Sequence, residues 1–416
     1  MAEDPKQDLW RFIRLDQYTR PPEPAQETLR KGIFGVWDRL GWGKKPGPLL
    51  EENNLSHAPV DLPVPDWSAG IAAVTAALDD WLDATQPEPL VQVFVGPSCS
   101  GTPQILAQWA RAKGWDLLAP PEAEQILAGG GEWLAQVDDG SVAPLVLTNL
   151  EHCYLRHYDG LIMLRRLLEI MLSHHRRWLV GCDSWAWAYF RQVFKVDGML
   201  RSPWILAPFG QERLRVWLPE ITQVASKPGF VFRQSDNGKF ILPPAVAGKN
   251  DLPDQDQPEP EASPNLSNFL KYLAAYSRGI PGIAWAIWRR SLYLAMEQEV
   301  EEEMDGHGDG QPQAIGDKNT IWVKPWHQLT WPSIPNLPER PQLLLVLHAL
   351  VLHGGLWGDM VEEVLPFAPM EVLDYLHLLE ASGLVEPDQG FWRVAPAAYP
   401  AVRQALQSEG YLTDAI

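Results

Sequence analysis

Short apolar runs alternate with amphipathic stretches between Val91 and Leu218. The apolar runs predict strands over residues 91–95, 114–118, 144–147, 177–181 and 204–206. The stretches that follow them place apolar residues at helical spacing and predict helices that start near Ile105 and cover 161–172, 185–193 and 211–218. Strands that alternate with helices favour a parallel sheet with helices on both faces.

The pattern on either side predicts further elements. Residues 68–82 carry apolar positions at amphipathic spacing and predict a helix. A hairpin is expected at 229–243, where Asp236, Asn237 and Gly238 form the turn. A helical region follows from Asn265 to about Val300, with a break at 277–282. The C-terminal stretch 336–416 predicts three helices and two strands around the turn 388–390, which is the plan of a winged helix. The helices are expected at 340–353, 359–365 and 370–381.

These elements divide the chain into five parts. The first part, 1–65, predicts an irregular arm with aromatic patches at 10–12 and 34–37, which could dock on the next domain or on a partner. The remaining parts are an α/β core (66–248), an acidic Pro-rich linker (249–264), a helical region with an acidic Gly-rich loop (265–335) and the winged helix (336–416).

Composition limits the class of function. The 416 residues are 46% hydrophobic and carry a net charge of −19, which disfavours nucleic acid and anionic membranes unless basic residues cluster locally. Three cysteines indicate a reducing compartment without a disulfide framework. We find no signal peptide and no apolar run long enough for a transmembrane segment, so we expect a cytoplasmic protein. The 20 tryptophans should lie mostly in the core, and a Trp-rich surface would suit a protein partner.

The stretch GPSCSGT, residues 96–102, carries the main chemical signal. It follows a predicted strand and precedes a predicted helix, which is the layout of a phosphate-binding P-loop. The candidates for phosphate binding are Gly96, Ser98, Ser100, Gly101 and Thr102. However, Thr102 replaces the lysine of that motif, and Pro103 replaces the hydroxyl residue that holds Mg²⁺. Thr102 and Pro103 instead predict an ordinary helix start, with Thr102 as N-cap and Pro103 in the first helical position.

The landmarks in order resemble the AAA+ ATPases, in particular their origin-recognition and STAND-like branch. LVLTNLEH at 145–152 is similar to the Walker B strand, and WLVGCDSWAW at 178–187 falls at the sensor-1 strand. SRGIPGIAWAIWRR at 277–290 is similar to the lid helix with the sensor-2 arginine. The resemblance covers most of the chain and implies a P-loop NTPase-like sheet, a helical lid and a C-terminal winged helix.

The departures from this family pattern decide the function that we expect. Walker B aspartate aligns with Thr148, and sensor-2 arginine aligns with Gly282. Glu151 is left as the residual catalytic candidate, although a solvated or capping carboxylate is the simpler interpretation. Asp183 could be a sensor-like residue or the cap of the next helix, and we favour the cap. The resemblance then implies a pseudo-ATPase that regulates or scaffolds through protein partners or self-association. The first alternative is an ATP-binding, nucleotide-dependent switch with a non-standard P-loop, which binds ATP without hydrolysis or, as an enzyme, would be a weak ATPase. The second is a winged-helix protein associated with nucleic acid.

Other candidate chemistry is weaker. We expect no metal site, because the histidines and cysteines at 152, 153, 157, 174 and 175 lack ligand spacing. Cys99 could be a reactive thiol, although a small filler residue is the simpler interpretation. The arginines at 156, 165, 166, 176 and 177 could bind an acidic partner or form a solvated face. Nucleic acid is not expected as a partner, because residues 338–416 carry three arginines and eleven acidic residues.

Overall fold

The computed structural model describes residues 9–23, 55–57, 65–85, 87–173, 175–222, 230–242, 266–295 and 320–416. The aromatic patch at 34–37, the linker predicted at 249–264 and the acidic Gly-rich stretch near 299–310 lie outside these ranges.

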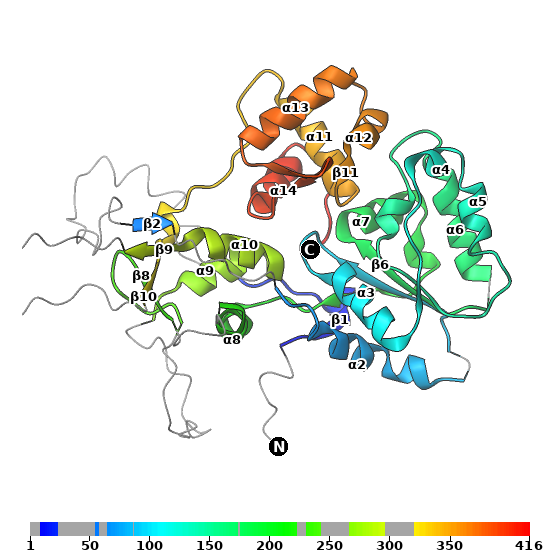
Figure 1. Cartoon of the computed structure of the whole chain (residues 1–416), viewed down its shortest axis with the longest axis horizontal. Coiled ribbons are helices and arrows are strands. Elements are labelled where there is room, and N and C mark those ends of the chain that lie inside the picture. Colours follow the sequence, from blue (N-terminus) through cyan, green and yellow to red (C-terminus); the bar gives the residue numbers. More distant parts are fainter. Residues whose placement is uncertain are drawn as a thin grey trace, which may run out of the picture.

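The central sheet has six strands in the order β1-β7-β3-β6-β5-β4 (Figure 1). Five of them run parallel: β3 (Val91–Gly96), β4 (Asp116–Leu117), β5 (Leu145–Leu147), β6 (Trp178–Asp183) and β7 (Trp204–Leu206). The strand β1 (Phe12–Arg14) pairs antiparallel with β7 at the edge. The strands predicted from the apolar runs are therefore present, and they form one mixed α/β sheet.

Burial explains why β3 and β6 lie at the centre of this sheet. All six residues of each strand are buried, and the two strands pair in register from Val91 with Trp178 to Gly96 with Asp183. A parallel strand that is covered on both faces is apolar along its whole length rather than alternating. Each large apolar side chain that is fully buried contributes about 1.5–3 kcal/mol to the stability of the folded protein.

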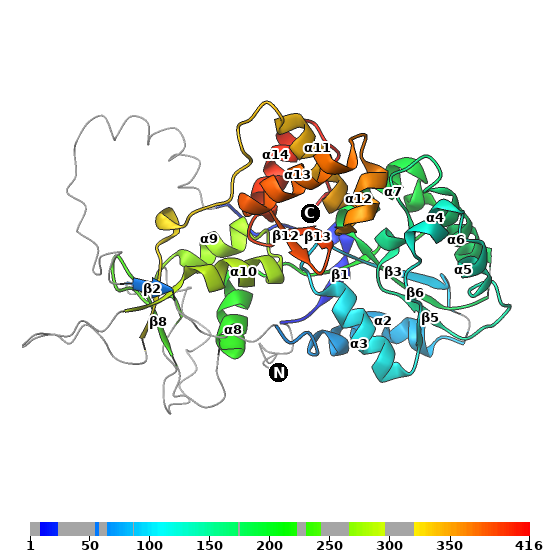
Figure 2. The ribbon, with the colours of Figure 1, turned by 45° about the horizontal axis from the view of Figure 1, so that its top comes forward.

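Helices cover both faces of the sheet. In Figures 1 and 2, α2 and α3 lie on one side, and α4, α6 and α7 lie on the other. The helices of this core are α2 (Gly70–Asp83), α3 (Thr102–Lys113), α4 (Ala123–Leu127), α5 (Gly131–Ala135), α6 (Ile162–Ser173) and α7 (Ser184–Val193). A 3-10 turn, η3 (Leu150–Cys153), follows β5. Other 3-10 turns are η1 (Leu15–Gln17), η4 (Val196–Gly198) and η5 (Trp326–Gln328).

The N-terminal part is not an irregular arm throughout, which corrects the prediction from the sequence. Residues 12–14 form β1 in the central sheet, and residues 55–57 form β2 in a second sheet. Trp10 docks in the core, with its ring edge-on to Trp67 and Phe209. The prediction failed because β1 is too short to show a pattern of its own, and its partner β7 lies far along the chain.

The second sheet has the order β2-β9-β10-β8, and it also corrects the sequence prediction. Helices α8 (Gln211–Thr222), α9 (Phe269–Tyr276) and α10 (Pro281–Ser291) are present. The helix expected to continue toward Val300 instead becomes strand β9 (Leu292–Ala295), which pairs with β10 (Thr320–Val323). The run Thr-Ile-Trp-Val of β10 favours extended structure, and its pairing overrides the helical pattern of the sequence before it.

The hairpin predicted at 229–243 is reduced to one strand and one bridge. Strand β8 (Val231–Gln234) leads into the turn at 235–237, and Arg233 then pairs antiparallel with Phe240. No full second strand is assigned in the described part of this segment. Along its length β8 pairs in parallel with β10, so a strand from far along the chain supplies its main partner.

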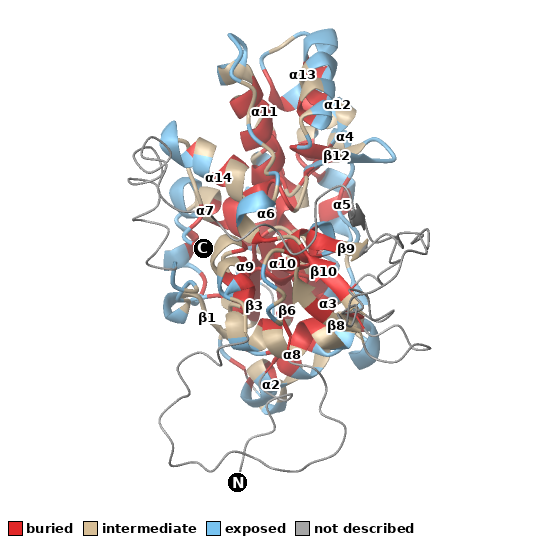
Figure 3. Ribbon diagram, turned by 90° about the vertical axis from the view of Figure 1, so that its left-hand side faces the viewer, coloured by how far each residue is buried: buried red, intermediate tan, exposed pale blue. Residues whose placement is uncertain are grey.

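The C-terminal domain, residues 336–416, has the three helices and the hairpin that the sequence predicts. Its elements are α11 (Arg340–Leu352), β11 (Leu356–Trp357), α12 (Gly358–Val364), α13 (Pro369–Ala381), β12 (Val385–Asp388), β13 (Phe391–Val394) and α14 (Tyr399–Ser408). The strand order is β11-β13-β12. Helix α11 is the buried axis of this domain, whereas α13 presents an exposed face (Figure 3). No helix in the described ranges is long and apolar enough to cross a bilayer.

Candidate functional site

The predicted site residues meet at the carboxyl ends of β3 and β6. From β3 the chain runs toward the β4 edge of the sheet. From the neighbouring strand β6 it runs to β7, toward the opposite edge, so the direction of the connections reverses between these two strands. Open α/β sheets bind ligands at this kind of position. Gly96, which begins the 96–102 loop, pairs in register with Asp183. The structure therefore brings together the loop and the sensor-like residue that the sequence singles out.

The polar side chains of the 96–102 loop bond to one another and to Asp183. The hydroxyl of Ser98 donates to Oδ2 of Asp183 at 2.9 Å. The hydroxyl of Ser100 donates to Oγ1 of Thr102 at 3.0 Å, and the backbone N–H of Thr102 donates to Oγ of Ser100 at 3.3 Å. The backbone N–H of Ser100 donates to O of Pro97 at 3.0 Å. These bonds use donors that a phosphate-binding loop would offer to its ligand.

The helix after the loop starts one residue earlier than the capping pattern predicts. Gly101, not Thr102, is the N-cap, and α3 begins at Thr102 with Pro103 in its second position. Gly101 has φ +80°, and a Cβ there would lie 2.3 Å from the ring of Trp67. Only glycine fits both the left-handed backbone and the ring that covers it. The correction follows from this backbone conformation, which a capping pattern does not reveal.

Asp183 and Glu151 form a buried pair of carboxylates beside the loop. Glu151 Oε2 accepts from the backbone N–H of Asp183 at 2.9 Å, and Glu151 Oε1 accepts from Nδ2 of Asn149 at 2.7 Å. Asp183 Oδ1 accepts from the backbone N–H of Trp185 at 2.8 Å, so Asp183 is the cap of α7. Burial, and then the nearby charge of Glu151, raise the pKa of Asp183 well above its usual range. Glu151 is 3% exposed, so the interpretation of it as a solvated carboxylate is wrong.

The chemistry available to this pair is limited. In the described part of the chain, the bonded partners of the two carboxylates are backbone N–H groups, an amide and a hydroxyl. No group of three or more His, Cys, Asp or Glu side chains among the described residues could hold a metal ion. Phosphate oxygens beside two carboxylates would need a cation to offset the repulsion.

Helix α10 closes directly over the loop. The backbone N–H of Gly282 donates to the carbonyl oxygen of Cys99 at 3.0 Å. A Cβ on Gly282 would lie 2.3 Å from that oxygen, so the close approach requires glycine. Gly282 is also the position that the AAA+ resemblance assigns to the sensor-2 arginine. The residue that departs from the family pattern is thus the residue that allows helix and loop to touch.

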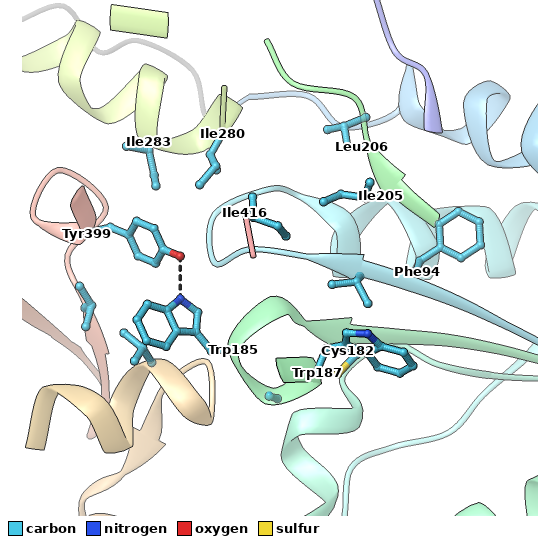
Figure 4. Packing of buried hydrophobic residues seen from close by; sticks show 14 of the residues in the cluster. Phe94, Cys182, Trp185, Trp187, Ile205, Leu206, Ile280, Ile283, Tyr399 and Ile416 are labelled. Carbon is cyan, nitrogen blue, oxygen red and sulfur yellow. Dashed lines mark hydrogen bonds between the residues drawn. The ribbon is translucent and has the colours of Figure 1, made fainter. Parts of the chain in front are cut away.

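The end of the described chain packs between the C-terminal domain, the core and the turn before α10. The hydroxyl of Ser184 donates to Oδ2 of Asp414 at 2.5 Å, and Arg403 pairs with Asp414 Oδ1 at 2.9 Å. Arg278 Nε donates to O of Ile416 at 3.0 Å. Figure 4 shows Ile416 between Ile280 and Ile205, close to the hydrogen bond between Trp185 and Tyr399. No pattern in the sequence indicates this cluster, because its members are far apart along the chain.

Cys99 and two of the five candidate arginines prove to be structural. Desolvation raises the pKa of the Cys99 thiol to about 12, which keeps the thiol protonated, as suits a filler residue rather than a nucleophile. Arg176 is buried and bonds to Ser141, Val137 and Asp139. Arg177 donates to the carbonyl oxygens of Leu82 and Ala84, at 3.0 and 2.6 Å. These two arginines therefore form neither an acidic-partner site nor a solvated face.

The tryptophans also differ from one expectation. Those in the described ranges are buried or partly buried, except Trp357, which is 46% exposed. A Trp-rich surface is therefore absent from the described part of the protein. His174, one of the histidines considered as metal ligands, lies outside the described residues.

Comparison with known proteins finds no matching family model and no matching curated protein. Among solved structures, the chain is similar to the Orc1 protein of Aeropyrum pernix in complex with DNA. The identity is 14%, the match covers 87% of this chain and 99% of that one, and the TM-score is 0.34. It is also similar to Cdc6p from Pyrobaculum aerophilum at 10% identity, covering 88% and 100% of the two chains with a TM-score of 0.31. Because identities and TM-scores are low, the function proposed below rests on this chain's own contacts.

Proposed function

We propose that this protein is a pseudo-ATPase with an AAA+-like core, which acts as a regulatory or scaffolding protein and does not turn over ATP. The observation that carries the proposal is the hydrogen bond from Gly282 to Cys99. The backbone of α10 bonds directly to the loop in which a nucleotide's phosphates would bind, and this contact supports the proposal that the loop holds no nucleotide.

The substitutions at Thr102 and Pro103 also weaken nucleotide binding, because they remove the lysine and the hydroxyl of the motif. A lysine contact to phosphate is a charged hydrogen bond, whose loss costs about 1.5–3 kcal/mol. That loss lowers affinity about ten- to a hundredfold. Asp183 and Glu151 contribute carboxylates where the ligand would add more negative charge. Without the lysine, the 96–102 loop has no charged side chain to offset the charge that develops during phosphoryl transfer.

Labelled-ATP binding to the full chain, with and without Mg²⁺, tests the proposal. We expect no saturable binding at micromolar ATP and no release of phosphate. A second protein carries Thr102→Lys and Pro103→Thr, which restore the Walker A side chains. Since α10 still covers the loop in that variant, we expect it to bind no ATP either. Micromolar, Mg²⁺-dependent binding by the unmodified chain would overturn the proposal. Binding by the restored variant alone would mean that side chains, rather than α10, exclude the nucleotide.

Association with nucleic acid is the second candidate, and the charge of the C-terminal domain argues against it. The exposed face of α13 carries Glu371, Asp374 and Glu380 and has no Lys or Arg. A recognition helix needs cations for phosphates and donors for base edges. The Aeropyrum pernix neighbour was solved with DNA. We expect no shift of duplex DNA by this chain at low salt, where electrostatic binding is strongest. A clear shift would favour the nucleic-acid function over the scaffold.

A further inference from the structure

A cavity of about 560 Å³ lies between the core and the C-terminal domain, beside the site described above. The core contributes the segment 120–126 and the turn η3, and the C-terminal domain contributes 353–360 and the hairpin turn 388–391. Figure 2 shows the β12–β13 hairpin and α12 on the side of the C-terminal domain that faces the core. The volume falls in the range of cavities that bind small ligands or single side chains.

Aromatic and apolar groups form much of the cavity wall. Trp357 is 46% exposed and packs edge-on against Phe391, with ring centroids 5.5 Å apart. His152 also contacts Phe391, at 6.3 Å between ring centroids. Leu155, Leu356 and Met360 add aliphatic surface. A partly exposed tryptophan in the wall of an apolar cavity can stack on a flat cationic group.

The charged side chains in the wall all have one sign. They are Glu122, Glu151 and Asp388, and the described lining residues include no Lys or Arg. Two arginines lie outside the lining: Nη1 of Arg156 lies 3.1 Å from Nδ1 of His348, and Arg393 pairs with Glu386 at 2.8 Å. The buried ring of His353 adds no positive charge, because burial lowers its pKa to about 3. The acidic side chains that line the cavity therefore favour a cation as its occupant.

We propose that this cavity binds the arginine side chain of a protein partner, with the guanidinium stacked on Trp357 and facing Asp388. The proposal deepens the scaffolding function above and rests on it. Arginine fits better than lysine, because a planar guanidinium stacks on an aromatic ring and is weakly hydrated. The aliphatic wall then contacts the methylene stem. Because the cavity draws its walls from both the core and the C-terminal domain, an occupant would also join the two.

The experiment uses the full chain labelled with 5-fluorotryptophan, and Trp357→Phe identifies the fluorine resonance of Trp357. The probe is N-acetyl-arginine-N-methylamide. The matched control is the citrulline analogue, which has nearly the same shape without the charge. We expect the arginine probe to shift the Trp357 resonance saturably, with a dissociation constant of about 1 mM, as for a fragment-sized ligand. The citrulline probe should bind at least about tenfold more weakly. Equal binding of the two, or no shift, would overturn the proposal.

Two variants and one alternative cation locate the site and its source. Asp388→Asn should weaken the arginine probe about two- to fivefold, as expected for a partly exposed charge. Glu362→Gln, an exposed carboxylate on α12 that does not line the cavity, should leave binding unchanged. Propylguanidine, the alternative cation, carries the same guanidinium and single charge without a peptide-like end. If propylguanidine bound as tightly as the blocked arginine, the occupant would be a free small cation and not a partner's side chain.

A last arm separates this proposal from the scaffolding function. ATP is added to the same labelled protein in the absence of probe. Binding of ATP at micromolar concentration would contradict the proposed function, while the difference between arginine and citrulline would still decide the cavity. Conversely, if the arginine probe did not bind, the arginine site would be wrong, but the proposal that the protein does not turn over ATP would be unaffected.

Discussion

The 96–102 loop and the cavity beside Glu151 both lie at the carboxyl ends of the central strands, but the loop is covered and the cavity is open. The 96–102 loop is covered by the protein's own backbone, through the bond from Gly282 to Cys99, and by the ring of Trp67 on Gly101. The cavity beside Glu151 remains open, although the same pair of carboxylates lies between the two regions. The sequence motif lies in the first region, and the space for a ligand lies in the second. A familiar motif therefore locates a place in a fold without showing that the place is accessible.

The comparison depends most on the contact between α10 and the loop, and Gly282→Ala is the substitution with the largest expected effect. The added Cβ would meet a backbone oxygen at 2.3 Å, which cannot move as a side chain can. We expect a loss of about 3 kcal/mol in the free energy of unfolding, measured by urea titration.

Gly131→Ala is the matched control for this substitution. Gly131 also lies in the first turn of a helix, α5, but nothing lies within 4 Å of a Cβ added there. Alanine should therefore stabilise by about 0.5–1 kcal/mol through its helix propensity. If Gly282→Ala behaved like the control, α10 would not cover the loop, and the difference between the two regions would disappear.

On the cavity side, two buried histidines should make the packing of the C-terminal domain sensitive to acid. Burial, and then the charge of Arg156, lower the pKa of His353 to about 3 and that of His348 to about 4. A histidine whose folded pKa is depressed stabilises the protein above its unfolded pKa of about 6.5, and this stability is lost as the pH falls. As the pH falls from 7 to 5, each histidine should lower the free energy of unfolding by up to about 2 kcal/mol.

Urea titrations at several pH values check this dependence. His353→Gln should remove about half of the loss in free energy of unfolding that the two histidines cause between pH 7 and pH 5, because glutamine does not titrate. His377→Gln is the control, since the side chain of His377 on α13 is 58% exposed. An unchanged slope in His353→Gln would mean that the wall of the cavity is not buried as described.

The smallest effect is expected at Asp183, on the loop side. Its raised pKa means that its contribution to stability is complete below the unfolded value of about 3.8 and is lost as the pH rises through the folded value. Asp183→Asn keeps an oxygen for the cap of α7 and removes the buried charge. We expect the variant to be about 1 kcal/mol more stable than the unmodified chain at pH 8, with a smaller gain at lower pH.

Asp66→Asn provides the contrast by thermal or urea unfolding. Asp66 also accepts from a nearby backbone N–H, that of Ser68, but hydrogen bonds from Ser68 lower its pKa. Asp66→Asn should therefore lower the free energy of unfolding slightly, whereas Asp183→Asn should raise it. A loss of stability in Asp183→Asn at every pH would show that the charge of Asp183 is used, for instance to bind a cation at the loop.

Much of the fold could be predicted from local pattern. The strands at Val91 and Trp178 are apolar throughout because both their faces are buried, and the helix cap at Asp183 follows from its place before Trp185. The failures have physical causes of another kind. The strand at Leu292 depends on pairing with β10, and β1 depends on pairing with β7, which lies in a distant part of the chain. Neither pairing leaves a periodic signal in its own short segment.

The amino-acid sequence by itself determined which charges this protein has and which it lacks. The threonine and proline at 102 and 103, the threonine at 148 and the acidic face of α13 are all readable without a structure, because chemistry belongs to residue types. Only the tertiary structure decided what occupies the space around them. The contacts from Cys99 to Gly282 and from Ser184 to Asp414 join segments that are far apart along the chain. They arise from backbone approach and from packing of whole domains, which leave no pattern in the sequence.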